Sequence, residues 1–92
     1  MNGIRGEVVV GLAGVERRLC LTLGALAEIE TGLGVEGLGG VAERMRALSA
    51  RDLTVVLAAL LRGGGELEAA AETVEPREAA EAIARAFAAA AG

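Results

Sequence analysis

The sequence contains no histidine, lysine, tryptophan or tyrosine, and it has only one cysteine, Cys20, and one aromatic residue, Phe87. Histidine is the usual general acid or base at neutral pH, and a nucleophile needs a neighbouring base or a lowered pKa. Cys20 has no histidine to activate it and no second cysteine to pair with, so we expect it to be a small buried apolar residue. The sequence therefore predicts no catalytic residue, no metal site and no cofactor, and it argues against an enzyme.

Neutral polar side chains and phosphate-binding motifs are also scarce. Asn2, Ser49 and four threonines are too few to predict a pocket of convergent polar groups. Residues 32–40 include five glycines, but they lack the Gly-Lys-Ser/Thr ending of a P-loop and the strand-to-helix context of a dinucleotide fingerprint. We therefore expect no small-molecule substrate and no bound nucleotide.

The charge balance is acidic, with 13 acidic residues against 9 basic ones, all of them arginine, and a net charge of -4. Nucleic-acid binding requires a basic patch that displaces phosphate counterions, and Arg17–Arg18 is the only basic pair. The strongly apolar stretch 53–61 is much shorter than the roughly 20 residues of a membrane-spanning helix. Residues 1–6 do not lead into the apolar stretch of a secretory signal. We expect a soluble cytoplasmic protein with no nucleic-acid or membrane partner.

Over residues 6–21, apolar side chains occupy alternate positions in two short runs joined by a turn, which predicts a β-hairpin. Val8 and Val10 fall on one face of a first strand, Ala13–Gly14 supplies the turn, and residues 15–21 form a second strand. A hairpin of two strands is marginal in water by itself. We therefore expect its apolar face to pack on helices, or its edge to pair with a strand of another copy.

From residue 22 to residue 91, the apolar residues recur at the spacing of α-helices. Thr22 is a predicted N-cap, and Gly32 is expected to end the first helix in the left-handed conformation. The glycine-rich segment 32–40 is predicted to be a loop, because so many glycines are costly to order in a helix. A second helix is predicted over 41–48.

The segment from Ser49 to Asp52 resembles a capping box and predicts a helix that begins at Ala50 and ends at the three glycines 63–65. A short helical stretch is expected over 67–74. The helix from Ala50 carries the most hydrophobic stripe in the chain, so we expect it to be the central core helix. Its predicted core residues are Leu53, Val56, Leu57, Leu60 and Leu61.

Pro76 suits the first turn of a last helix, in which Ala80, Ile83, Ala84 and Phe87 are predicted to share a face. That alanine-rich face could pack on the chain's own core or dock another helix. The predicted fold is α+β, a single domain over 1–92 with a hairpin followed by a small bundle of about four α-helices. The predicted partner-binding residues are Val8 and Val10 on the hairpin, and Ile83 and Phe87 on the last helix.

The order of these features resembles a known family. The pieces are a strand GEVVVGLAG, a strand running into a helix RRLCLTLGALAEIETGLG, a glycine-rich linker, SARDLTVVLAALLRGGG, and an alanine-rich end EAAEAIARAFAAAAG. They resemble the small tail-cluster proteins of gene transfer agents, phage-like particles made by alphaproteobacteria, described as a phage tail tube or tail-assembly chaperone family. The resemblance covers residues 5–92, and its most specific pieces are LTLGALAEIETGLG and LAALLRGGGE.

This resemblance implies a non-enzymatic role in tail morphogenesis. A tail-assembly chaperone would coat the long helical tape-measure protein through apolar helix surfaces until tube subunits replace it. Many weak contacts would suit that task, because multivalent binding is firm yet releases stepwise. The implied partners are the tape-measure protein or other tail proteins, together with further copies of the chain, in the cytoplasm or in the particle itself.

Other functions stay open at this point. One alternative is a structural tube subunit that is retained in the particle, although tube subunits build rings from large β-sheets and this chain has room for about two short strands. Another is a small protein-interaction module unrelated to tails. A small enzyme or ligand-binding protein would need a polar pocket that the sequence does not predict.

Overall fold

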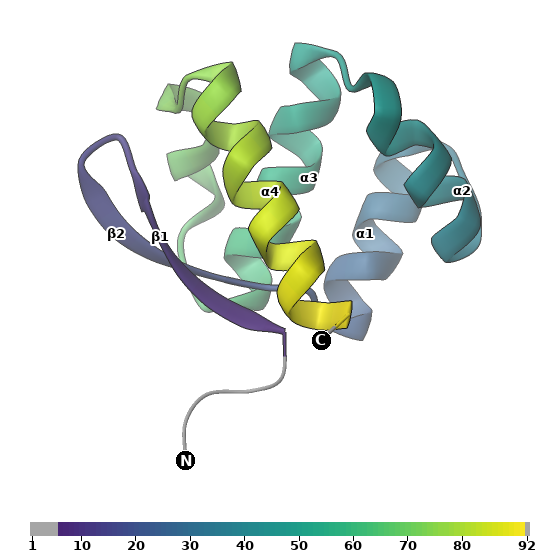
Figure 1. Cartoon of the computed structure of the whole chain (residues 1–92), viewed down its shortest axis with the longest axis horizontal. Helices are drawn as coiled ribbons and strands as arrows, with labels where there is room; N and C mark the ends of the chain where they lie inside the picture. The colour runs from purple at the N-terminus through teal and green to yellow at the C-terminus, as the bar shows by residue number, and fades with distance from the viewer. Residues whose placement is uncertain (1–5, 92) are drawn as a thin grey trace.

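A computed structural model describes residues 6–91 of the chain (Figure 1). The hairpin comes first along the chain, and the helices follow it. Two antiparallel strands form the only sheet among these residues, and all the helices follow them along the chain. This confirms the predicted α+β class. The elements are β1 (Glu7–Leu12), β2 (Val15–Cys20), α1 (Leu23–Leu33), α2 (Gly37–Arg44), the 3₁₀ turn η1 (Met45–Ala47), α3 (Ala50–Gly63), the 3₁₀ stretch η2 (Glu68–Thr73) and α4 (Pro76–Ala91).

The hairpin forms with the predicted turn. Ala13 and Gly14 both have positive φ, 53° and 83°, and they join strands that pair from Leu12 with Val15 to Glu7 with Cys20. A two-residue turn in which both residues have positive φ is a type I′ turn, and its backbone twist matches the right-handed twist of the two strands that it joins. The apolar face of the hairpin packs on the chain's own helices, with α4 beside β1 and α3 beside β2.

Helix α1 begins as predicted and ends later than predicted. The Thr22 hydroxyl accepts a hydrogen bond from the Ala25 backbone N–H at 2.9 Å. The left-handed residue that ends the helix is Gly34, with φ of 71°, and not Gly32. Gly32 lies inside the helix where α1 crosses α3, and a Cβ atom at this position would overlap the Val55 side chain. Its missing side chain therefore allows two helices to approach closely.

The predicted loop over 32–40 is wrong for most of its length, because α2 already begins at Gly37 and ends at Arg44 rather than Leu48. The Glu30 carboxylate accepts a hydrogen bond from the Gly37 backbone N–H at 2.6 Å, which satisfies one free donor at the start of α2. Val41 is 1% exposed. Burial of Val41 and this hydrogen bond offset the poor helix propensity of the glycines.

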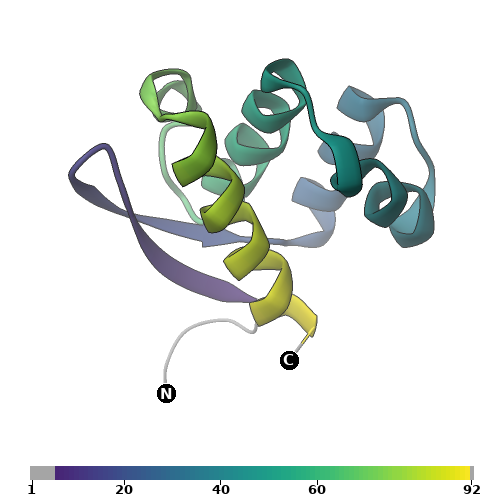
Figure 2. The same cartoon turned by 45° about the horizontal axis from the view of Figure 1, so that its top comes forward.

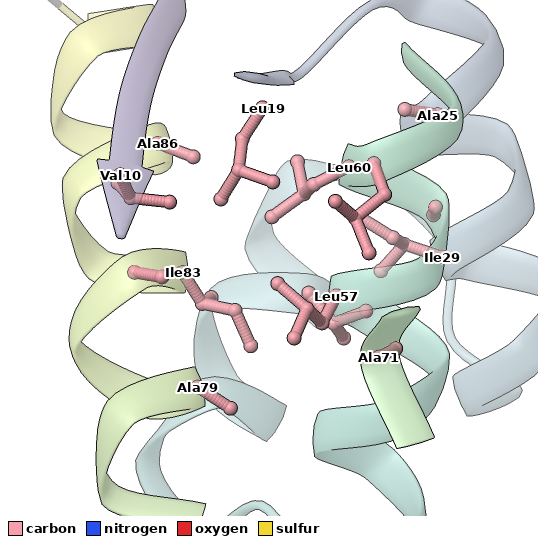
Figure 3. Packing of buried hydrophobic residues seen from close by; sticks show 14 of the residues in the cluster. Val10, Leu19, Ala25, Ile29, Leu57, Leu60, Ala71, Ala79, Ile83 and Ala86 are labelled. Carbon is pink, nitrogen blue, oxygen red and sulfur yellow. The ribbon is translucent and has the colours of Figure 1, made fainter. Parts of the chain in front are cut away.

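Helix α3 is the centre of the core, as predicted. The Ser49 hydroxyl and the Asp52 carboxylate form the reciprocal capping box at its start. The helix contacts α1, α4, β2 and η2, and its buried side chains belong to one core cluster with those of Val10, Leu19, Ile29 and Ile83 (Figure 3). Of the predicted core residues, Leu53 is partly exposed and the other four, Val56, Leu57, Leu60 and Leu61, are buried.

Helix α4 begins at Pro76 as predicted but turns a different face to the core. The buried residues are Ala79, Ala82, Ile83 and Ala86, whereas Ala80 and Ala84 are exposed. Because alanine occupies all sides of this helix, the positions of the apolar residues do not indicate which face is buried. The prediction that Ala80 and Ala84 share a face with Ile83 is therefore wrong, because Ile83 is buried and the two alanines are exposed.

Candidate partner-binding surface

The four residues predicted to bind partners lie in different surroundings. Val10 and Ile83 are 4% and 1% exposed, and Figure 3 shows both side chains pointing into the chain's own core. Val8 and Phe87 are partly buried and keep some surface. The structure thus brings Val10 and Ile83 together as core residues, and partner contact stays a prediction for Val8 and Phe87.

Phe87 borders an apolar groove at one end of the molecule. The groove has a volume of about 300 Å³ and lies between the start of α1, the start of α2 and the end of α4. Leu23 and Leu38 on its rim are 84% and 62% exposed, far more than leucine usually is in a folded domain. The lining residues are Leu21, Thr22, Leu23, Leu26, Leu38, Phe87, Ala90 and Ala91, and none of them is charged.

Both exposed leucines lie in the first turn of a helix. Thr22 caps α1, so Leu23 is the first residue of its first turn, before the buried positions Ala25 and Ile29. Leu38 is likewise in the first turn of α2, three residues before the buried Val41. Neither leucine was singled out as an exposed residue from the sequence. Their positions next to the helix starts were the available signal.

A second, more open groove runs between α1 and α3. It has a volume of about 550 Å³ and is lined mainly by small residues, among them Ala27, Gly32 and Ala58. An ion pair lies at its edge, where Arg62 Nη2 contacts Glu28 Oε1 at 2.7 Å. This hydrogen bond raises the pKa of Arg62 above its ordinary value. Unlike the groove beside Phe87, this groove has charged residues in its lining.

Several ionisable side chains of the fold have structural partners. Arg44 Nε and Nη2 each contact the Asp52 carboxylate at 3.2 Å, and Arg44 Nη1 donates to the Leu33 carbonyl at 2.8 Å. The backbone N–H of Ser49, followed by Arg44, lowers the pKa of Asp52. Burial raises the pKa of the Cys20 thiol, which keeps it protonated. These groups stabilise helix ends and the core and do not converge on either groove.

The described part of the chain holds neither a candidate metal cluster nor a candidate membrane-spanning helix. Within residues 6–91, no three carboxylate or thiol side chains lie close enough together to hold a metal ion. Among the helices of the same residues, none combines the length and the apolar character that spanning a bilayer requires.

Comparison with known proteins identifies one family. A family model described as "Phage tail tube protein, GTA-gp10" matches residues 5–92. No curated protein and no solved structure matches the chain. The family match covers both the hairpin and the helices that form the groove.

Proposed function

The chain belongs to the phage tail tube protein family described as GTA-gp10, and on that premise we propose that it is a tail-assembly chaperone that binds the tape-measure protein. It is a phage tail-related protein of the gene transfer agent type. The proposed role is non-enzymatic and belongs to assembly of the tail in the cytoplasm. The observation that supports it best is the uncharged groove with Leu23 and Leu38 exposed on its rim.

The size of the groove supports a weak contact for each copy. About 300 Å³ accommodates a few apolar side chains of a partner helix. Burial of one leucine contributes about 1.5–3 kcal/mol, and much of this is offset by the cost of association. A row of copies along one long helix would bind firmly through multivalency, and each copy could still be displaced singly.

A structural subunit of the tail tube is the second candidate, and the family description favours it. Against it stands the sheet content, because residues 6–91 form only one hairpin of two six-residue strands. A tube ring is built from larger sheets, so this chain would need strands from other copies or other proteins. The two candidates differ in whether the chain stays in the finished particle.

Light scattering of the purified protein, alone and with a helical fragment of the tape-measure protein, tests the first candidate. The wild-type chain is expected to form a complex with several copies per fragment. Leu38→Glu is expected to lose the complex, because a carboxylate at the rim would be desolvated on binding. Leu67→Glu is the matched control, since Leu67 is 74% exposed but does not line the groove.

Both substitutions lie at exposed positions and should leave the fold intact. No complex with the wild-type chain would contradict the proposal. A complex that survives Leu38→Glu as well as Leu67→Glu would show that the groove is not the binding surface. Scattering of the protein alone across concentration reports whether copies associate without the fragment.

A further inference from the structure

The two edges of the hairpin differ in what covers them. The outer edge of β2 is covered by the turn that follows α3. The Glu66 carboxylate accepts a hydrogen bond from the Arg18 backbone N–H at 3.0 Å and contacts Arg17 Nη1 at 3.3 Å. Gly63 and Gly64 lie so close to this edge that a Cβ atom on either would overlap the carbonyl oxygen of Cys20 or Arg18. No strand can therefore be added beside this part of β2.

The same contacts define the free edge of β1. Arg18 is paired with Val9, and its N–H points out of the sheet toward Glu66. In an antiparallel ladder the two residues of a pair either exchange both hydrogen bonds or exchange neither. The backbone N–H and C=O of Val9 therefore point away from β2, and by alternation so do those of Glu7 and Gly11.

Nothing in the described part of the chain pairs with this edge of β1. Among residues 6–91, no hydrogen bond joins the outward backbone groups of Val9 or Gly11 to another residue. The Val9 side chain is 50% exposed, and Gly11 is exposed too. Unpaired backbone groups along a strand edge are a template for another extended chain.

A hollow beside the edge has a defined charge. It has a volume of about 140 Å³ and adjoins Val10 and Gly11, with Glu78, Glu81 and Arg85 of α4 on its other side. The Glu78 carboxylate also accepts a hydrogen bond from the Ala13 backbone N–H at 3.2 Å. Two carboxylates against one guanidinium leave a net negative charge, which favours a basic side chain.

The position of α4 argues against a second copy as the added strand. Helix α4 runs alongside β1 and contacts it along its length, from Ala90 near Gly6 to Glu78 near Ala13 (Figures 1 and 2). Two copies joined through their β1 edges would place their strands about 4.8 Å apart. Two packed helices need about 8–10 Å, so the α4 helices of the two copies would collide.

We propose that the outer edge of β1 binds an extended segment of another protein by strand addition, with a basic side chain of that segment in the hollow beside Glu78 and Glu81. The backbone groups of Val9 and Gly11 supply the hydrogen bonds, and the carboxylates select the charge. This surface is separate from the groove beside Phe87. Its occupation neither requires nor excludes the proposed chaperone function.

Nuclear magnetic resonance titration of the folded protein tests this proposal. The probe is an acetylated, amidated peptide of alternating threonine and valine with one central arginine. At millimolar peptide, the amide signals of Val9 and Gly11 are expected to shift, whereas those of the groove residues Leu23 and Leu38 should not. A peptide with glutamate in place of the arginine is expected to bind at least about tenfold more weakly, which corresponds to about 1.4 kcal/mol.

Two modifications separate backbone pairing from side-chain contact. Val9→Pro removes an outward N–H without touching the ladder to β2, and it should weaken binding about tenfold, the effect of one lost hydrogen bond. Val9→Thr keeps the backbone donor and should bind like the wild type. If Val9→Pro disturbs the fold, the same peptide N-methylated at every residue provides the test on the unaltered protein, and it is expected not to bind.

Each contrary result overturns a definite part of the proposal. Unchanged Val9 and Gly11 signals at millimolar peptide, or equal binding of the N-methylated peptide, would refute strand addition. Equal binding of the arginine and glutamate peptides would refute the role of Glu78 and Glu81. Signals of Val9 and Gly11 that shift with protein concentration alone would assign the edge to a second copy and overturn the assigned partner.

Discussion

Substitution of Gly63 by alanine tests the close approach between the end of α3 and β2, on which the difference between the two hairpin edges depends. Gly63 is the last residue of α3, and alanine is the better helix former by about 1 kcal/mol. The new Cβ atom, however, would overlap the Cys20 carbonyl oxygen and lie 3.2 Å from its carbon. Those are backbone atoms, which cannot rotate away as a side chain can.

The expected change in the free energy of unfolding combines the gain in helix propensity with the cost of the overlap with the Cys20 backbone. Overpacking in a well-packed region costs about 1–3 kcal/mol, and a clash with backbone belongs at the upper end. After the gain in helix propensity, Gly63→Ala should lower the free energy of unfolding by about 2 kcal/mol. Gly39→Ala is the matched control, because Gly39 is exposed in α2 and a Cβ atom there meets nothing within 4 Å. It should raise the free energy of unfolding by about 1 kcal/mol.

Urea unfolding followed by circular dichroism measures both changes, provided that the dependence of the free energy on urea stays equal among the variants. Opposite signs for the two glycines are the expected result. A stabilising Gly63→Ala would mean that α3 does not approach β2 as closely as the structure shows. In that case this part of the outer edge of β2 would be less covered than the structure shows.

Three further predictions concern the core, acid stability and the hairpin turn. Leu57 is fully buried in α3, so Leu57→Ala should cost about 3 kcal/mol in urea unfolding, and a loss below about 1 kcal/mol would contradict its central position. Because the pKa of Asp52 is lowered in the folded state from its ordinary 3.8, its contribution to stability is present at neutral pH and is lost as the pH falls below that value. Urea midpoints measured from neutral to acidic pH should therefore fall less steeply in Asp52→Asn than in the wild type, and equal slopes would refute this role. Ala13 has a φ of 53°, so Ala13→Asn should raise the free energy of unfolding by about 1 kcal/mol, and a destabilised variant would argue against this turn.

The elements that the sequence predicted well are those with local chemical signals. The Ala13–Gly14 turn, the Thr22 cap, the capping box at Ser49 and the start at Pro76 all depend on residues within a few positions of one another. Such signals act before any distant part of the chain is in place. They were sufficient for the fold class and for the start of most elements.

The remaining differences arise from contacts between residues far apart in the sequence. Glycine propensity predicts a loop at 37–40, and the hydrogen bond from Gly37 to Glu30 together with burial of Val41 overrides it. The face that α4 buries depends on where β1 and α3 lie, since alanine surrounds the helix. For the same reason the sequence could not distinguish Ile83, a core residue, from Phe87, which borders the groove.

Quantitative mass spectrometry of purified particles tests the central claim most directly. A tail-assembly chaperone leaves when tube subunits replace it on the tape-measure protein. The account therefore predicts that this chain is depleted from finished particles, far below the copy number of the ring-forming tube subunit. Recovery of the chain at a copy number equal to that of the tube rings would contradict the account and identify a structural subunit.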